Sequence, residues 1–225
     1  TGMAIWQAKQ VCPELVVLPA DMGEYIRFSK MAREIYEKYT DRIEPFGLDE
    51  SWLDVTGSVG LFGSAMRIAE EISERIKFEL GITASIGVSD NKITAKMGSD
   101  YKKPDATTVF SRAQMEELVW PLPVGSMLYV GGRFERQLRE LGIRTIGDLA
   151  HADRKALVAS LGKAGGELYD YANGLDKSPV KSIYEPKEVK SVGNGLTFKR
   201  NLVGWDDIRL GVTVLADTVA ARMRR

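Results

Sequence analysis

The pattern of apolar residues predicts an α+β fold in the first half of the sequence and a small helical region after it. Three segments repeat apolar side chains at helical spacing, and four short segments are rich in β-branched and aromatic residues. In chain order the predicted elements are helix 21–40, strands 43–47 and 51–56, helix 61–80, strand 83–88, helix 91–97 and strand 107–110. The first five of these elements have the order α-β-β-α-β, which is that of a ferredoxin-like β-α-β-β-α-β unit without its opening strand.

Local signals support these elements one by one. The first helix repeats apolar or aromatic residues at intervals of three and four from Tyr25 to Tyr39. Gly81 provides a stop for the second helix, because glycine readily adopts the left-handed conformation that ends helices. The adjacent carboxylates Asp49 and Glu50 fall at or beside the turn between the first two strands. The sequence therefore predicts an acidic pair at a β-hairpin.

After the last of these strands, the sequence changes to short helical segments separated by glycine and proline. Two glycine turns, at 130–132 and 141–143, have the spacing of a helix-hairpin-helix motif. Residues 179–189 contain two prolines and lack a helical period, which predicts an extended linker. A strand-like stretch at 190–200 and a helix at 206–225 complete the chain, and one strand with one helix is too little to fold alone.

The composition excludes several classes of chemistry. The single cysteine, Cys12, and the single histidine, His151, exclude a disulfide framework, a zinc finger, a Cys–His nucleophile pair and a multi-histidine metal site. Catalysis would have to rest on carboxylates, lysine, arginine, serine or tyrosine. Lysine plus arginine and aspartate plus glutamate number 31 each, so the net charge indicates no polyanionic partner. No membrane span or signal segment is recognisable, and we expect a cytoplasmic protein.

Asp49 and Glu50 are the first candidates for chemistry. Carboxylate oxygens are hard ligands, and Mg²⁺ is usually held by one or two of them together with substrate phosphates. Alternation along a regular strand would put the two side chains on opposite faces, so a turn or bulge is needed for both to reach one ion. The alternative interpretation is a solvated turn in which Asp54 acts as a local cap.

Two further segments are candidates for phosphate binding. Lys102 and Lys103 precede Pro104, and a residue before proline is held extended, so its amine can project from a fixed backbone. A plain surface lysine pair is an equally good interpretation of this segment. The glycine turn at 130–132 precedes a helix that begins near Arg133, and such helix starts offer free N–H groups to phosphate. A helix-hairpin-helix motif contacts the phosphates of the DNA backbone, and such contacts do not depend on the base sequence.

Five motifs in fixed order resemble the Y family, the translesion DNA polymerases, and in particular its bacterial members. They read GLDESWLDVT, GVSDNKITAK, SDYKKPDATTV, the VGG helix-hairpin-helix and KSVGNGLTFKR. The resemblance covers essentially the whole chain and implies a ferredoxin-like palm, an all-helical thumb and the start of an α+β little finger. The implied domains are the end of the fingers at 1–20, the palm at 21–112, the thumb at 113–178, the linker at 179–189 and the little finger from 190 to 225.

The resemblance implies a template-directed DNA polymerase that adds deoxynucleotides to a primer 3′-hydroxyl during damage bypass and repair. Asp49 and Glu50 match two of three carboxylates that hold two Mg²⁺ ions, for which Mn²⁺ can substitute. In that scheme Asp49 bridges both ions, and Glu50 helps hold the ion that activates the primer hydroxyl. Lys103 matches the lysine that contacts the β- and γ-phosphates. The residues that match the seat of the DNA backbone are Val130, Gly131, Gly132 and Arg133.

The implied partners are primer-template DNA, deoxynucleoside triphosphates and a sliding clamp that would bind beyond residue 225, with no membrane partner. The sequence has no match to the family's first metal-ligand strand, to its aromatic steric gate or to most of its fingers. We therefore expect a fragment that is inactive alone, because two carboxylates cannot hold both ions. Gly47 replaces a common serine with little expected effect, and Tyr129 replaces a common glycine with uncertain consequences for the phosphate seat.

Two other functions remain open at this point. The first is a polymerase-like module that binds DNA while its palm is only a scaffold. The second is a nucleotide cyclase, because cyclases also place acidic residues on a ferredoxin-like hairpin. The helix-hairpin-helix and the Lys103–Pro104 segment argue against the cyclase.

Overall fold

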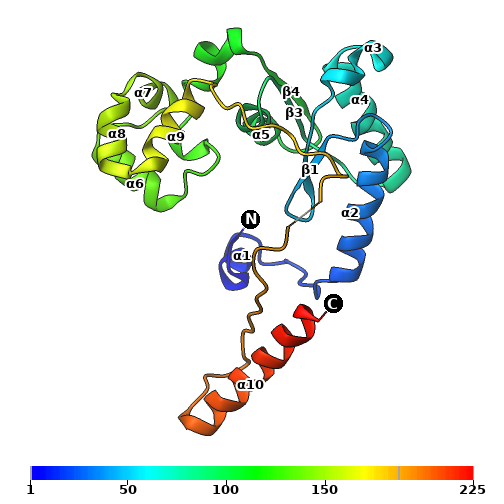
Figure 1. The fold of residues 1–225 in the computed structure, drawn as a ribbon, viewed down its shortest axis with the longest axis vertical. Coiled ribbons are helices and arrows are strands. Elements are labelled where there is room, and N and C mark those ends of the chain that lie inside the picture. The colour runs from blue at the N-terminus through cyan, green and yellow to red at the C-terminus, as the bar shows by residue number, and fades with distance from the viewer. Residues whose placement is uncertain (1, 187, 225) are drawn as a thin grey trace. The chain divides into compact units, whose positions relative to one another are not determined.

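The computed structural model describes residues 2–186 and 188–224, which form two units, Thr1–Ile183 and Tyr184–Arg225. The helices of the first unit are α1 (Ile5–Val11), α2 (Met22–Tyr36), α3 (Val59–Phe62), α4 (Ala65–Arg75), α5 (Lys92–Tyr101), α6 (Gly132–Glu140), α7 (Ile146–His151), α8 (Arg154–Leu161) and α9 (Lys163–Ala172). Its strands are β1 (Ile43–Phe46), β2 (Glu50–Leu53), β3 (Ile86–Ser89) and β4 (Thr107–Phe110). The predicted α+β class is confirmed (Figure 1).

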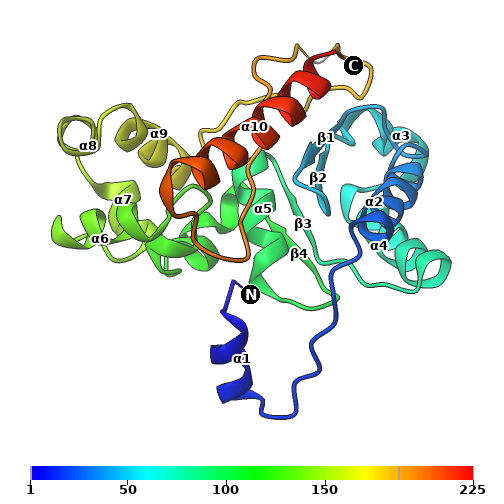
Figure 2. The same ribbon diagram turned by 90° about the horizontal axis from the view of Figure 1, so that it is seen from below.

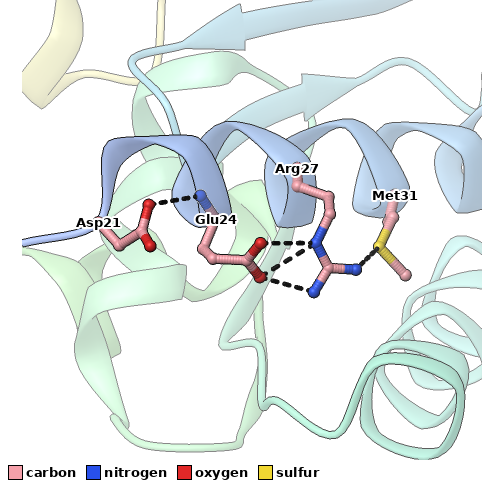
Figure 3. A network of polar contacts seen from close by, with 4 residues as sticks. All are labelled: Asp21, Glu24, Arg27 and Met31. Carbon is pink, nitrogen blue, oxygen red and sulfur yellow. Dashed lines mark hydrogen bonds and ion pairs between the residues drawn. The ribbon is translucent and has the colours of Figure 1, made fainter.

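Helix α2 begins where the sequence predicts, because Asp21 caps its first turn. The Asp21 carboxylate accepts a hydrogen bond of 3.1 Å from the Glu24 N–H. Glu24 then pairs with Arg27 at 2.6 Å, and the Arg27 guanidinium reaches the Met31 sulfur at 3.5 Å (Figure 3). This chain of contacts runs along the exposed side of the helix. The helix ends at Tyr36, earlier than predicted.

The predicted strands are all present in the first unit, but they do not form a single sheet. Strands β1 and β2 pair antiparallel, with Phe46 opposite Glu50. Strands β3 and β4 pair in parallel, with Ile86 opposite Thr107, and α5 makes the crossover that a parallel pair requires. In the described part of the chain no strand bonds to both pairs, so the ferredoxin-like set is divided into two small sheets.

Helix α5 lies directly on β3, as Figures 1 and 2 both show. The contact depends on Gly87, where an added Cβ would be only 1.8 Å from the Ala95 carbonyl oxygen. Across the contact, a Cβ at Gly98 would be 3.2 Å from the Gly87 Cα. Glycine in a strand commonly marks such a close backbone approach. This packing fixes the position of every side chain that α5 presents.

The hydrophobic core runs without interruption from α5 into the helical region. Ile93 and Met97 of α5 belong to the same buried cluster as Leu138 of α6 and Leu149 of α7. Phe110, at the end of β4, is completely buried in this cluster. A second cluster joins α2 to α4. The predicted palm and thumb residues therefore share apolar packing, which sets the helix-hairpin-helix against α5.

Thr108 offers a test of this packing. Its side chain is buried, and its hydroxyl has no hydrogen-bond partner among the described residues. A buried hydroxyl without a partner loses its hydration without compensation. We expect Thr108→Val to leave the free energy of unfolding unchanged or to raise it by about 1 kcal/mol, measured by urea denaturation. A loss of more than about 1 kcal/mol would show that the hydroxyl has a structural partner.

The second unit consists of α10 (Gly204–Met223) and the segment before it. The strand predicted at 190–200 is wrong, since the structure has no strand in the described residues of this unit. An isolated strand has no neighbour for its backbone groups. Hydrogen bonds from Arg200 lower the pKa of Asp207 to about 2. Among the described residues, no helix is both long and apolar enough to cross a bilayer.

The first residues of the predicted linker are hydrogen-bonded within the first unit. The Lys181 N–H donates to the Glu44 carboxylate at 3.0 Å, and the Ile183 N–H donates to the Asp41 carbonyl at 3.0 Å. The first part of the linker is therefore attached to the strand that begins the hairpin. Lys187 lies outside the described residues.

Candidate metal and phosphate site

The acidic pair lies at the tip of the β1–β2 hairpin, as the sequence predicts. Asp49 is the last residue of the turn and is exposed, while Glu50 is the first residue of β2, with its side chain 37% exposed. The turn is held from α2, where the Ser29 hydroxyl donates to the Leu48 carbonyl and Arg33 donates to Ser29. Because Asp49 is outside the strand, strand alternation does not force the two carboxylates apart.

The two departures from the family pattern both fall at left-handed backbone positions. Gly47 has a φ of 78°, which serine rarely adopts, and the effect expected of this difference stays a prediction. Tyr129 has a φ of 71°, at a position where the family often has glycine. The turn before the helix-hairpin-helix therefore keeps the conformation of glycine while presenting an exposed aromatic ring.

A chain of ion pairs connects Glu50 with Lys103. The Lys96 ammonium lies 3.2 Å from a Glu50 oxygen and 2.5 Å from Oδ2 of Asp100. Asp100 also contacts Lys103, whose Nζ lies 2.6 Å from Oδ1. The structure thus links the predicted metal ligand to the predicted phosphate lysine through two residues of α5. It records no ion pair for Asp49 among the described residues.

Lys96 and Asp100 remain charged because they form a hydrogen-bonded ion pair with each other. Burial alone would lower the pKa of Lys96, but hydrogen bonds to Asp100 and Glu50 outweigh it and raise the pKa above its usual value. Burial likewise would raise the pKa of Asp100, but hydrogen bonds from Lys103 and Lys96 hold that pKa below its usual value. The site therefore alternates negative and positive charge at neutral pH.

A second set of contacts fixes the hairpin to the start of α5. Lys92 pairs with Glu44 at 2.5 Å, its carbonyl accepts from the Trp52 indole at 3.0 Å, and its ammonium lies 5.2 Å from the Trp52 ring centroid. The Asn91 side chain caps α5 by accepting from the Thr94 N–H. These contacts are structural, because they join the hairpin to the first turn of α5.

The glycine turn presents fewer free N–H groups than the sequence suggests. Val130 is buried, and its N–H donates to the Met127 carbonyl at 3.0 Å. Gly131 is the N-cap of α6, and no described side chain bonds to that end of the helix. The first N–H groups of a helix lack intrahelical partners. The open donors therefore begin at Gly131 and Gly132, beside the exposed Arg133.

A groove joins the two parts of the site. It has a volume of about 450 Å³ and lies between α5, through Lys96 and Asp100, and the loop from Ser126 to Gly131. The structure therefore brings together Glu50, Lys96, Asp100 and Lys103, and places the glycine turn across the groove. Lys96 and Asp100 were not among the predicted site residues, although their spacing of four on a helix is the signal of an ion pair.

The donors fit a hard divalent cation. Two adjacent carboxylates at the tip of the hairpin match the one or two that Mg²⁺ takes from a protein, the rest being water and phosphate. Among the described residues no three acidic, histidine or cysteine side chains are grouped to hold an ion. Asp49 and Glu50 are therefore the candidate ligands in the described part of the chain, and a complete site needs further oxygen donors.

Comparisons with known proteins agree with this geometry. Residues 1–100 match the impB/mucB/samB family. The whole chain is 50% identical to DNA polymerase IV of Acetivibrio thermocellus and 41% identical to DNA polymerase IV 1 of Bacillus subtilis, and it covers 56% and 54% of their lengths. The chain therefore spans about half the length of these curated relatives.

The chain is also similar to solved structures of DNA polymerases. A Y-family DNA polymerase chimera, Dbh-Dpo4(243-245)-Dbh, matches 98% of this chain with a TM-score of 0.83 and 29% identity, over 63% of its own length. The insertion ternary complex of Dbh DNA polymerase matches 80% of the chain with a TM-score of 0.72 and 31% identity, over 53% of its own length. Over nearly all of its length, the chain is similar to DNA polymerases of the Y family. Within that family, its curated relatives are bacterial DNA polymerases IV.

Proposed function

We propose that this chain carries the catalytic centre of a template-directed, translesion-type DNA polymerase. The observation that carries the proposal is the ion-pair chain that places Glu50 and Lys103 at one site, across a groove from Gly131. A metal-binding carboxylate, a phosphate-binding lysine and a seat for the DNA backbone are the three parts that nucleotidyl transfer needs. The names of the relatives support the same activity.

In this proposal Asp49 and Glu50 hold Mg²⁺, with Mn²⁺ as a substitute, and a third carboxylate from outside the described residues completes a two-ion site. The bound ions would activate the primer hydroxyl and neutralise charge on the reacting phosphate. The hairpin turn gives Asp49 free access to solvent and substrate. Helix α2 keeps the turn in place through Ser29 and Arg33.

Lys103 would bind the β- and γ-phosphates of the incoming deoxynucleotide. Its side chain is 53% exposed, so a phosphate can reach it without displacing packed side chains. Gly131, Gly132 and Arg133 would hold a backbone phosphate of the primer-template DNA, while Val130 positions this turn from the core. The assignment of fingers, palm, thumb, linker and little finger, and a sliding clamp as partner, remain predictions of the sequence.

Primer extension tests this function. The protein is a chain of the relatives' length that contains these 225 residues, called the full-length chain below. We expect it to extend a labelled primer on a DNA template with Mg²⁺ and all four deoxynucleotides, and not with EDTA. DNA binding without extension would contradict the proposal and favour the non-catalytic binding module. A cyclic nucleotide formed without DNA would favour the cyclase.

The glycine turn can be tested separately from catalysis. A Cβ at Gly131 would meet no atom within 4 Å, so Gly131→Ala should fold normally. The added methyl would stand where a phosphate must approach the N–H groups, and we expect DNA affinity to fall about tenfold. Gly57→Ala is the matched control, because a Cβ there also meets open space. Fluorescence anisotropy with labelled duplex gives the affinities, and equal values for both variants would exclude the turn as a DNA contact.

A further inference from the structure

Asp100 occupies an unusual position in the site, because it lies between the proposed phosphate lysine and a second lysine. One of its oxygens contacts Lys103 at 2.6 Å, and the other contacts Lys96 at 2.5 Å. We propose that Asp100 is a latch that competes with the nucleotide triphosphate for Lys103, and that Lys96 sets the strength of this latch. The inference rests on the proposed function of Lys103 and assigns two positioning residues to the same site.

The two contacts of Asp100 differ in how easily they can be exchanged. The Lys96 side chain is only 14% exposed and also contacts Glu50, so moving it would break its contacts with two carboxylates at once. Lys103 is 53% exposed and Asp100 is 46% exposed, and such exposed pairs contribute little stability. An arriving polyanion would therefore displace Asp100 from Lys103, while Asp100 keeps its contact with Lys96.

The contact of Asp100 with Lys96 weakens the attraction between Asp100 and Lys103. A carboxylate that neutralises two ammonium groups attracts each of them less than it would attract one alone, because the second cation offsets part of its charge. Without Lys96, the full charge of Asp100 would act on Lys103, and a triphosphate would have to compete with a stronger internal partner. Without the charge of Asp100, Lys103 would be free. Loss of Lys96 should therefore lower the affinity for triphosphate, and loss of the Asp100 charge should raise it.

The test measures binding of inorganic triphosphate, without divalent metal, to the 225-residue chain by isothermal titration calorimetry. We expect Asp100→Asn to bind about two- to fivefold more tightly than the wild type, which is the range of an exposed ion pair. Lys96→Met should bind more weakly by a similar factor, and Lys96→Arg should restore wild-type affinity. The absence of metal removes the metal-binding role of Asp49 and Glu50 from the readout.

Two matched controls come from the Lys77–Asp105 pair, whose atoms are also 2.6 Å apart. Asp105→Asn changes the same charge two residues from Lys103, and asparagine tolerates the left-handed φ of 54° at that position. Lys77→Met removes a lysine charge without touching the latch. Both controls should change triphosphate affinity less than the corresponding latch variants.

Three results would overturn the latch. They are no triphosphate binding by the wild type, equal affinity of Asp100→Asn and Asp105→Asn, and weaker binding in both latch variants. If Lys96→Met proves unfolded by circular dichroism, Asp100→Asn and Lys96→Arg decide alone. In the full-length chain, Asp100→Asn should lower the KM for deoxynucleotide. Primer extension with an unchanged KM would refute the latch and leave the proposed function intact, whereas absent extension would refute the function itself.

Discussion

Replacing Asp49 by asparagine should reduce nucleotide addition by the full-length chain more than about 100-fold. Changes in residues that only orient a metal ligand already cost about 10- to 100-fold, so the loss of a ligand itself should cost more. Asp49 is exposed and has no recorded ion pair in the described part of the chain, so its charge is not needed for folding. The expected defect is therefore in kcat, with normal thermal unfolding, and single-turnover addition of one nucleotide measures it.

Asp54→Asn is the control for this result. Asp54 belongs to the same hairpin region, but its carboxylate accepts a hydrogen bond of 3.0 Å from the Thr56 N–H and acts as a local cap. We expect this variant to lose some stability and to keep nucleotide addition within about threefold of the wild type, since loss of a cap costs only about 1 kcal/mol. If Asp49→Asn were as active as Asp54→Asn, the acidic pair would be a solvated turn and the metal site would lie elsewhere.

Gly87→Ala should destabilise the first unit by about 3 kcal/mol or more. Its Cβ would lie 1.8 Å from the Ala95 carbonyl and 2.6 Å from the Ser99 nitrogen, both of which are backbone atoms of α5. Backbone cannot move aside as a flexible side chain can, so helix and strand must separate. Because α5 carries both latch residues, the site should be lost together with the fold. The midpoint of urea denaturation measures the effect.

Gly57→Ala again provides the control, because a Cβ at that position meets no atom within 4 Å. Its stability should stay within about 0.5 kcal/mol of the wild type, as for most surface substitutions. A Gly87→Ala protein with wild-type stability would show that α5 does not lie directly on β3. The positions of Lys96 and Asp100 derived from that contact would then be wrong as well.

The elements set by local chemistry could be predicted from the sequence. The start of α2 follows from Asp21 as its cap, the hairpin from the short apolar strands around Asp49, and the start of α6 from the glycine turn. The position of the acidic pair could be predicted for the same reason. Each of these features depends on residues only a few positions apart.

Features that depend on distant residues could not be predicted in this way. The contact between Lys96 and Glu50 joins α5 to the hairpin across 46 positions, and no local pattern reveals it. The division into two sheets depends on which strands pair, and the predicted strand at 190–200 lacks a partner in its own unit. The requirement for glycine at Gly47 became visible only from its backbone conformation.

The central claim is that Asp49 and Glu50 together hold the divalent ion used in nucleotidyl transfer. Electron paramagnetic resonance of Mn²⁺ bound to the full-length chain, with primer-template DNA and a non-hydrolysable deoxynucleotide, tests it most directly. The account predicts a bound-ion signal in the wild type and in Asp54→Asn. It predicts loss of that signal in the double variant Asp49→Asn with Glu50→Gln. Equal Mn²⁺ affinity in all three proteins would contradict it.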